Sequence, residues 1–305
     1  MIYIKLEDEL KECNERFKFF NRKFLNFKNK FSKLKEDKFD NIILITLPNI
    51  ENYTLNKLSK YIKTKCINRV CLSEDLMNKD IFMEFIKNEK VKIFDGKWLF
   101  KHLLNECIEY ICNNKKEKIM YQEISILSNN IDKFIIYNIM EIAPKVRVFN
   151  IVTQKESLFK KIEKQLYEEK GIILNIGNNY KKSLSKSDII FNFDFSEEEI
   201  NKYNFSPKSC IINLDGERKI NIKSFLGINA NFYEIQMPRK YLRNSLYLKN
   251  FNNSILYESY IYKNTNPQNI KKEIREDEIS IQFLDGKNGR IRKNEYINLS
   301  KKITN

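Results

Sequence analysis

Strands that alternate with helices occupy most of the chain after residue 40, and this alternation restricts the fold more than any other feature of the sequence. Apolar segments suited to buried strands and amphipathic segments suited to helices follow one another at 41–47, 53–63, 67–72, 79–88, 91–94 and 97–115. Parallel strands joined by helices form sheets that are covered on both faces. The pattern therefore predicts an α/β domain over residues 41–120, in which the helix 97–115 bridges to the rest of the chain.

The same alternation begins again after Lys118 and predicts a second α/β domain over residues 121–238. Its strands and helices are expected at 123–127, 131–143, 146–152, 157–170, 172–176, 188–193, 197–203 and 210–214. Residues 239–305 differ from both domains. They predict a helix through 241–262, in which 250–254 is a candidate break, and a β-hairpin whose turn lies at 285–289, because Asp-Gly pairs favour tight hairpin turns.

Residues 1–40 carry an apolar residue at every third or fourth position. The series is Tyr3, Leu6, Leu10, Cys13, Phe17, Phe20, Phe24, Phe27, Phe31 and Leu34. Such spacing predicts one long amphipathic helix. Two interpretations stay open: a coiled-coil contact that forms a homodimer, or a helix that packs across its own domain, which the bulky phenylalanines favour.

Positive charge is concentrated near the carboxyl terminus. The chain carries a net charge of +15, and residues 239–305 contain 14 Lys and Arg against 7 Asp and Glu. A basic surface favours phosphate-rich partners, so Lys287, Arg290, Arg292 and Lys293 on the predicted hairpin are candidates for contacts with nucleic acid. No signal segment follows Met1 and no apolar run approaches the roughly 18–20 residues of a membrane span. We therefore expect a cytoplasmic protein without membrane contact.

Three segments of the second domain carry a family resemblance: 148–155, 187–192 and 207–214. In order and spacing, residues 123–237 resemble the NAD(P)-binding domain of the shikimate dehydrogenase and glutamyl-tRNA reductase group. This resemblance implies a Rossmann-like fold. It also implies that a dinucleotide would lie against Ser128, Asn129 and Asn130 after the first strand, against Thr153, Gln154 and Lys155 after the second, and against Asn192 at the end of the fourth.

The first of these turns departs from the family pattern. It reads Ser128-Asn129-Asn130-Ile131-Asp132 and lacks the glycines that let the backbone approach a pyrophosphate. Asp132 would also place a negative charge in the first turn of the helix, where it repels phosphate. Thr153, Gln154 and Lys155 suit a 2′-phosphate, so NADP is favoured over NAD if either binds. We expect first that the protein binds no cofactor.

Other candidate sites are weaker. Asn178, Asn179, Lys181, Lys182 and Ser183 form a polar loop between two strands, where doubly wound folds bind ligands. The cysteine pairs 66/71 and 107/112 are spaced so that their side chains diverge, which predicts no metal site. His102 is interpreted as a packed residue. No residue is assigned as catalytic.

The sequence thus favours an α/β protein with two parallel-sheet domains, the second Rossmann-like, and a function in binding a protein or a small anionic ligand without catalysis. Two alternatives stay open. One is an NADP-dependent oxidoreductase similar to shikimate dehydrogenase. The other is a nucleic-acid-binding protein that uses the basic carboxyl-terminal region.

Overall fold

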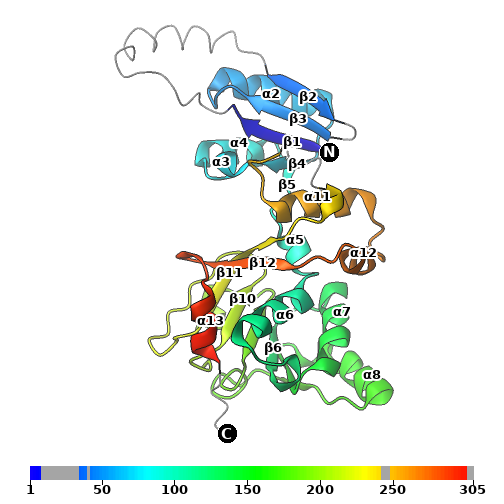
Figure 1. Cartoon of the computed structure of the whole chain (residues 1–305), viewed down its shortest axis with the longest axis vertical. Helices are drawn as coiled ribbons and strands as arrows, with labels where there is room; N and C mark the ends of the chain where they lie inside the picture. Colours follow the sequence, from blue (N-terminus) through cyan, green and yellow to red (C-terminus); the bar gives the residue numbers. More distant parts are fainter. Residues whose placement is uncertain (8–33, 40–41, 242–247, 301–305) are drawn as a thin grey trace. The chain divides into compact units, whose positions relative to one another are not determined.

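The computed structural model describes residues 1–7, 34–39, 42–241 and 248–300, and the chain divides into two units (Figure 1). Unit 1 consists of Met1–Gly96 and Met237–Glu273, and unit 2 of Lys97–Gln236 and Ile274–Asn305. The segment 239–305 is therefore shared between the two units.

Unit 1 contains a five-stranded sheet in its described part, in the order β2-β3-β1-β4-β5. Its strands are β1 (Ile2–Leu6), β2 (Lys35–Phe39), β3 (Ile42–Leu47), β4 (Arg69–Leu72) and β5 (Lys92–Ile93). β2 runs antiparallel to β3, and the remaining pairs are parallel. The described helices of this unit are α2 (Asn52–Thr64), α3 (Glu74–Met77), α4 (Asp80–Asn88), α11 (Asn253–Asn264) and the first part of α12 (Ile270–Glu276).

The predicted helix over residues 1–40 is wrong at both of its ends, because Ile2–Leu6 and Lys35–Phe39 are strands. β1 is a central strand, and Tyr3 and Ile4 are both buried, on opposite faces of the sheet. A strand that is apolar on both faces places apolar residues at spacings of three as well as two, so it matched the helical pattern. Residues 8–33, which carry most of that pattern, lie outside the described residues, and so does the predicted dimer contact.

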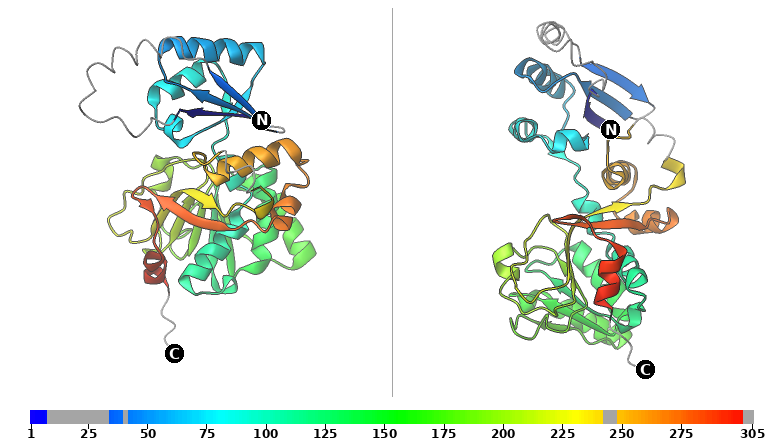
Figure 2. Two further views of the ribbon diagram at one scale, coloured as in Figure 1. Left: turned by 45° about the horizontal axis from the view of Figure 1, so that its top comes forward. Right: turned by 60° about the vertical axis from the view of Figure 1, so that its left-hand side comes forward.

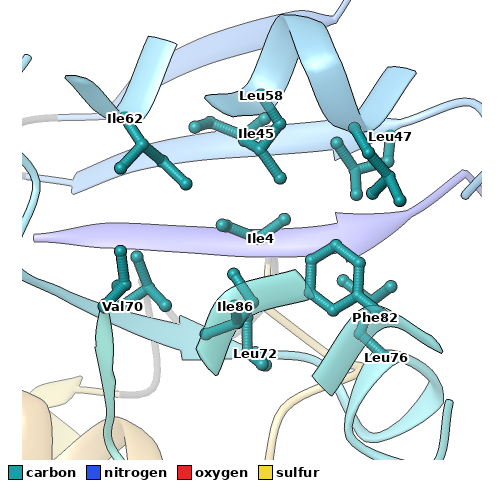
Figure 3. Packing of buried hydrophobic residues seen from close by; sticks show 12 residues of the cluster. Ile4, Ile45, Leu47, Leu58, Ile62, Val70, Leu72, Leu76, Phe82 and Ile86 are labelled. Carbon is teal, nitrogen blue, oxygen red and sulfur yellow. The ribbon is translucent and has the colours of Figure 1, made fainter. Parts of the chain in front are cut away.

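Alternate residues of the unit 1 sheet face two different hydrophobic clusters. Ile4, Ile45 and Val70 face α2 and α4, whereas Tyr3 and Leu44 face α11. Figure 3 shows Ile4 at the centre of the first cluster, between Leu58 of α2 and Phe82 of α4. The returning segment 237–273 therefore completes the core of a unit that begins at Met1.

The Ile4→Val substitution is expected to lower the free energy of unfolding by about 1 kcal/mol, because it removes one methylene from a fully buried site. Urea denaturation, with amide exchange of β1 and β3 to localise the loss, measures the change. Ile81→Val is the control, since Ile81 is largely exposed. Equal losses for both variants would contradict this packing.

Unit 2 contains an eight-stranded sheet in its described part, and its parallel strands follow the Rossmann order. The parallel strands are β6 (Glu123–Leu127), β7 (Val148–Val152), β8 (Asn175–Gly177), β9 (Ile189–Asn192), β10 (Cys210–Asn213) and β11 (Ile228–Ile235). Their spatial order, β8-β7-β6-β9-β10-β11, is 3-2-1-4-5-6 in chain order. This order confirms the prediction of a Rossmann-like domain. β11 was not predicted from the sequence.

The helices of unit 2 cover this sheet. Those described are α5 (Lys97–Phe100), α6 (Leu104–Lys115), α7 (Lys133–Ile142), α8 (Lys160–Lys170), α9 (Glu197–Ile200) and α13 (Lys293–Leu299). The helix predicted at 97–115 is therefore two helices, interrupted at 101–103. Among all the helices that the structure describes, none has the length and apolar character required to cross a bilayer.

The predicted β-hairpin is confirmed and extends the sheet beyond β11. β12 (Ile281–Gly286) runs antiparallel to β11 and turns into β13 (Gly289–Arg290), as can be followed in Figure 2. Gly286 allows the close approach of β11, since a Cβ there would lie 2.8 Å from the carbonyl oxygen of Asn229. Gly289 has a φ of +91°, a conformation that glycine adopts without strain.

Candidate functional site

An internal carboxylate fills the turn that would bind a dinucleotide. The turn Ser128–Asn130 follows β6, and in Rossmann folds its backbone N–H groups contact the pyrophosphate. Here the Asp194 carboxylate accepts from the backbone N–H groups of Asn129 (2.9 Å) and Asn130 (3.1 Å). It also accepts from the Ser128 hydroxyl (2.9 Å) and the Asn130 side-chain amide (2.8 Å). The donors that would meet a phosphate are thus satisfied by the protein itself.

Two further carboxylates lie around this turn. Asp132 caps the amino terminus of α7 and accepts from the backbone N–H of Ile135 at 2.9 Å. Glu199 accepts from the side-chain amide of Asn129 at 3.3 Å. Negative charge at a helix amino terminus compensates the helix dipole and repels another anion. The turn therefore offers a pyrophosphate an unfavourable electrostatic environment.

The structure places the segment 153–155 beside this turn. The backbone N–H of Gln154 donates to the side-chain oxygen of Asn129 at 2.8 Å. Thr153 is fully buried, and its hydroxyl accepts from the backbone N–H of Lys155 at 3.0 Å. Gln154 and Lys155 are exposed. Of the three candidates for a 2′-phosphate, only these two present their side chains to solvent.

Asn192 belongs to a network of side-chain amides on three adjacent strands, here called the asparagine network: Asn192, Asn213, Asn229 and Asn231. Asn192 and Asn213 end β9 and β10, whereas Asn229 and Asn231 lie in the first half of β11. All are buried except Asn229, which is half-buried. Asn192 donates to the side-chain oxygen of Asn213 (3.0 Å) and closes the loop to Phe195 through two hydrogen bonds. Asn213 donates to the side-chain oxygens of Asn229 (2.8 Å) and Asn231 (2.9 Å). These amides connect β9, β10 and β11.

The asparagine network also fixes the backbone of Arg218. Asn231 accepts from the N–H of Arg218 at 3.0 Å, and Asn229 donates to its carbonyl oxygen at 2.7 Å. Both backbone groups of this residue are therefore held by side chains of the asparagine network. Of these residues, only Asn192 was predicted from the sequence.

The polar loop after β8 is organised by Asn179. Its side-chain oxygen accepts from the backbone N–H groups of Lys181 (3.0 Å) and Lys182 (3.1 Å). Ser183 donates its backbone N–H to the Asn179 carbonyl oxygen at 2.9 Å. Asn178, Lys181 and Lys182 are exposed. The loop adjoins the segment 153–155, because Thr153 bonds to Gly177.

A cationic pocket of about 590 Å³ lies beside the hairpin β12–β13. Its five basic side chains are Arg218, Lys219, Lys287, Arg290 and Arg292. Glu295 is the one carboxylate that the described residues contribute to the lining. The structure thus brings three of the four predicted basic residues together with Arg218 and Lys219. These two were missed, because they precede the hairpin by about 70 residues in the sequence.

Contacts within the protein orient two arginines of the pocket, Arg290 and Arg218. The Arg290 guanidinium lies 4.5 Å from the ring centre of Phe283, and its residue pairs across the hairpin with Asp285. Burial raises the pKa of Asp285, and the charge of Arg290 opposes this shift. The Arg218 side chain donates to the Glu217 carbonyl oxygen at 2.9 Å.

His102 and two of the cysteines are packed inside the protein. His102 is buried between the rings of Trp98 and Phe134, whose centres are 4.8 Å and 4.7 Å away. Burial raises the pKa of both Cys112 and Cys210 to about 12, so these thiols stay protonated. Within the described residues, no three His, Cys, Asp or Glu side chains are grouped to hold a metal ion.

No family model and no curated protein matches the chain. Similar solved structures include L-tryptophan dehydrogenase from Nostoc punctiforme, with 10% identity, a TM-score of 0.34 and coverage of 90% of this chain and 79% of that one. The catalytic subunit of aspartate transcarbamoylase from M. jannaschii has 12% identity, a TM-score of 0.31 and coverage of 86% of both chains. For Δ1-pyrroline-2-carboxylate reductase from Thermococcus litoralis the identity is 10%, the TM-score 0.25 and the coverage 38% of this chain and 36% of that one.

Similarity at this level assigns no family and no activity to the chain. The Rossmann-like architecture of unit 2 rests on its strand order. The finer resemblance to the shikimate dehydrogenase and glutamyl-tRNA reductase group stays a prediction.

Proposed function

We propose that this protein binds a phosphate-bearing anion in the cationic pocket and acts by binding, not by catalysis. The observation that carries the proposal is that five basic residues line one hollow of about 590 Å³. This volume is within the range of about 300–1,000 Å³ that is usual for small-molecule sites. Arginine guanidinium groups form paired hydrogen bonds to phosphate oxygens, which suits this lining to phosphate.

We also propose that no dinucleotide binds at the turn 128–130, where Rossmann folds usually bind the pyrophosphate. A pyrophosphate there would have to displace the Asp194 carboxylate from four hydrogen bonds. It would also approach Asp132 and Glu199, which carry the same sign of charge. These contacts disfavour the alternative of an NADP-dependent oxidoreductase.

Calorimetric titration of the full chain with tripolyphosphate, NADP and NAD tests the proposal. Replacing Arg290 and Arg292 with Gln is expected to weaken tripolyphosphate binding at least tenfold, because about 1.5–3 kcal/mol is lost for each hydrogen bond to a charged group. Lys160→Gln with Lys161→Gln removes the same charge from the exposed side of α8 and serves as the matched control.

NADP carries a 2′-phosphate and is expected to bind only through the cationic pocket, so the Arg290 and Arg292 replacements abolish that binding too. Tight NADP binding that survives these replacements would overturn the proposal and support the oxidoreductase alternative. Equal weakening in the α8 control would show that net charge, and not the pocket, attracts the anion.

A further inference from the structure

A second hollow lies against the first, on the same hairpin. It also measures about 590 Å³ and shares Asn288, Arg290, Ile291 and Arg292 with the cationic pocket. Tyr110, Asn114, Gln282 and Lys293 complete its lining. Because these four residues line both hollows, the two hollows are adjacent parts of the surface around the hairpin. A single small anion would occupy only part of that surface.

We propose that the ligand is a single-stranded nucleic acid that runs across both hollows. This inference rests on the proposed function and adds the class of ligand. The two hollows together present six basic side chains, Arg218, Lys219, Lys287, Arg290, Arg292 and Lys293, so successive phosphates of one strand meet successive cations. Arg290 and Arg292 line both hollows and mark the point at which the strand passes between them.

Each hollow also holds one aromatic ring on which an unpaired base can stack. Phe225 lines the cationic pocket and Tyr110 lines the second hollow. The Tyr110 ring is held edge-to-face against the buried Tyr296, at 5.7 Å between ring centres. Burial raises the pKa of Tyr110, so its hydroxyl stays neutral. A stacked base contributes about 1–3 kcal/mol and requires no particular sequence.

Amide side chains supply hydrogen-bonding groups for the base edges. Asn221, Asn288 and Asn294 line the cationic pocket, and Asn114 and Gln282 line the second hollow. Base edges and faces are accessible in a single strand, whereas a duplex presents mainly its phosphates to a concave surface. The combination of cations, rings and amides therefore favours a single strand over a duplex.

Fluorescence anisotropy of a labelled 15-nucleotide oligo(dT), titrated with the full chain, tests the inference. With about four phosphate contacts, the affinity is expected to fall about 50-fold between 50 and 200 mM salt, since each contact adds about 0.7 to the logarithmic slope. Gln replacements of Lys287, Arg290, Arg292 and Lys293 should flatten this slope and abolish binding at 200 mM salt. The matched control replaces the exposed Lys160, Lys161, Lys164 and Lys202 and should retain the slope.

Leu replacements of Phe225 and Tyr110 separate stacking from charge. Each is expected to weaken oligonucleotide binding at least fivefold without changing the salt slope, because no phosphate contact is removed. Thermal unfolding of each variant verifies that its fold is retained.

The outcomes distinguish this inference from the proposed function. If tripolyphosphate binds in the pocket but oligo(dT) does not, the nucleic-acid inference is wrong and the proposed function stands. If neither binds, both are wrong. A duplex of the same length that binds as tightly as oligo(dT), or oligonucleotide binding that the four Gln replacements leave intact, would also overturn the inference.

Discussion

Replacing Asp194 with Ala is expected to lower the free energy of unfolding of unit 2 by about 2–3 kcal/mol. The carboxylate accepts four hydrogen bonds from the turn 128–130, and hydrogen bonds to a charged group contribute about 1.5–3 kcal/mol each when they are buried. Asp194 is only half-buried, so water replaces part of this loss and the total stays well below the sum. Urea denaturation followed by tyrosine and tryptophan fluorescence measures the change.

Formate tests whether the lost stability of the Asp194→Ala variant comes from the missing carboxylate. Sodium formate is expected to raise the melting temperature of the Asp194→Ala variant more than sodium chloride of equal ionic strength does, because formate can occupy the vacated oxyanion position. The wild-type chain should show no such difference. Asp215→Ala is the control, because Asp215 is half-exposed and makes one ion pair, with Lys101 at 3.6 Å. If both variants lose the same free energy of unfolding and formate does not stabilise Asp194→Ala, the Asp194 carboxylate does not hold this turn.

The loss of the family's glycines was visible in the sequence, but the residue that fills their place was not. Ser128, Asn129 and Asn130 directly follow a predicted strand, so the position of the turn was predictable. Asp194 lies 64 residues beyond Asn130 and reaches it because β6 and β9 are neighbours in the sheet. Strand adjacency of this kind depends on the fold, and a single sequence contains no local signal for it.

Strand β11 could not be predicted from the pattern of apolar residues. Its residues include Asn229 and Asn231, which break the apolar pattern expected of a parallel strand. The two amides are accommodated because Asn213 donates to both of them. Polar residues in a buried strand are stable only when their partners are present, and those partners come from β10. The strands in which apolar residues predominate, β3 and β9 among them, were predicted from the sequence.

The largest predicted effect lies in the asparagine network. Asn213→Ala is expected to lower the free energy of unfolding by about 3–4 kcal/mol, because the residue is 1% exposed and its loss deprives three other amides of a partner, of which Asn192 and Asn231 are buried. Asn204→Ala is the control in the same unit: its side chain is exposed, and a change below about 0.5 kcal/mol is expected. Urea denaturation of both variants gives the difference.

The same substitution connects the network to the cationic pocket. Asn229 and Asn231 hold both backbone groups of Arg218, and Asn213 holds these two amides in place. At temperatures where the Asn213→Ala variant is fully folded, we therefore expect about tenfold weaker tripolyphosphate binding, the loss of roughly one charge-assisted contact. Arg218→Gln should produce the same weakening with little loss of stability, since within the described residues its side chain bonds to two carbonyl oxygens, those of Phe195 and Glu217. If Asn213→Ala binds the anion as tightly as the wild-type chain, the network stabilises the sheet, and anion binding does not depend on its hold on Arg218.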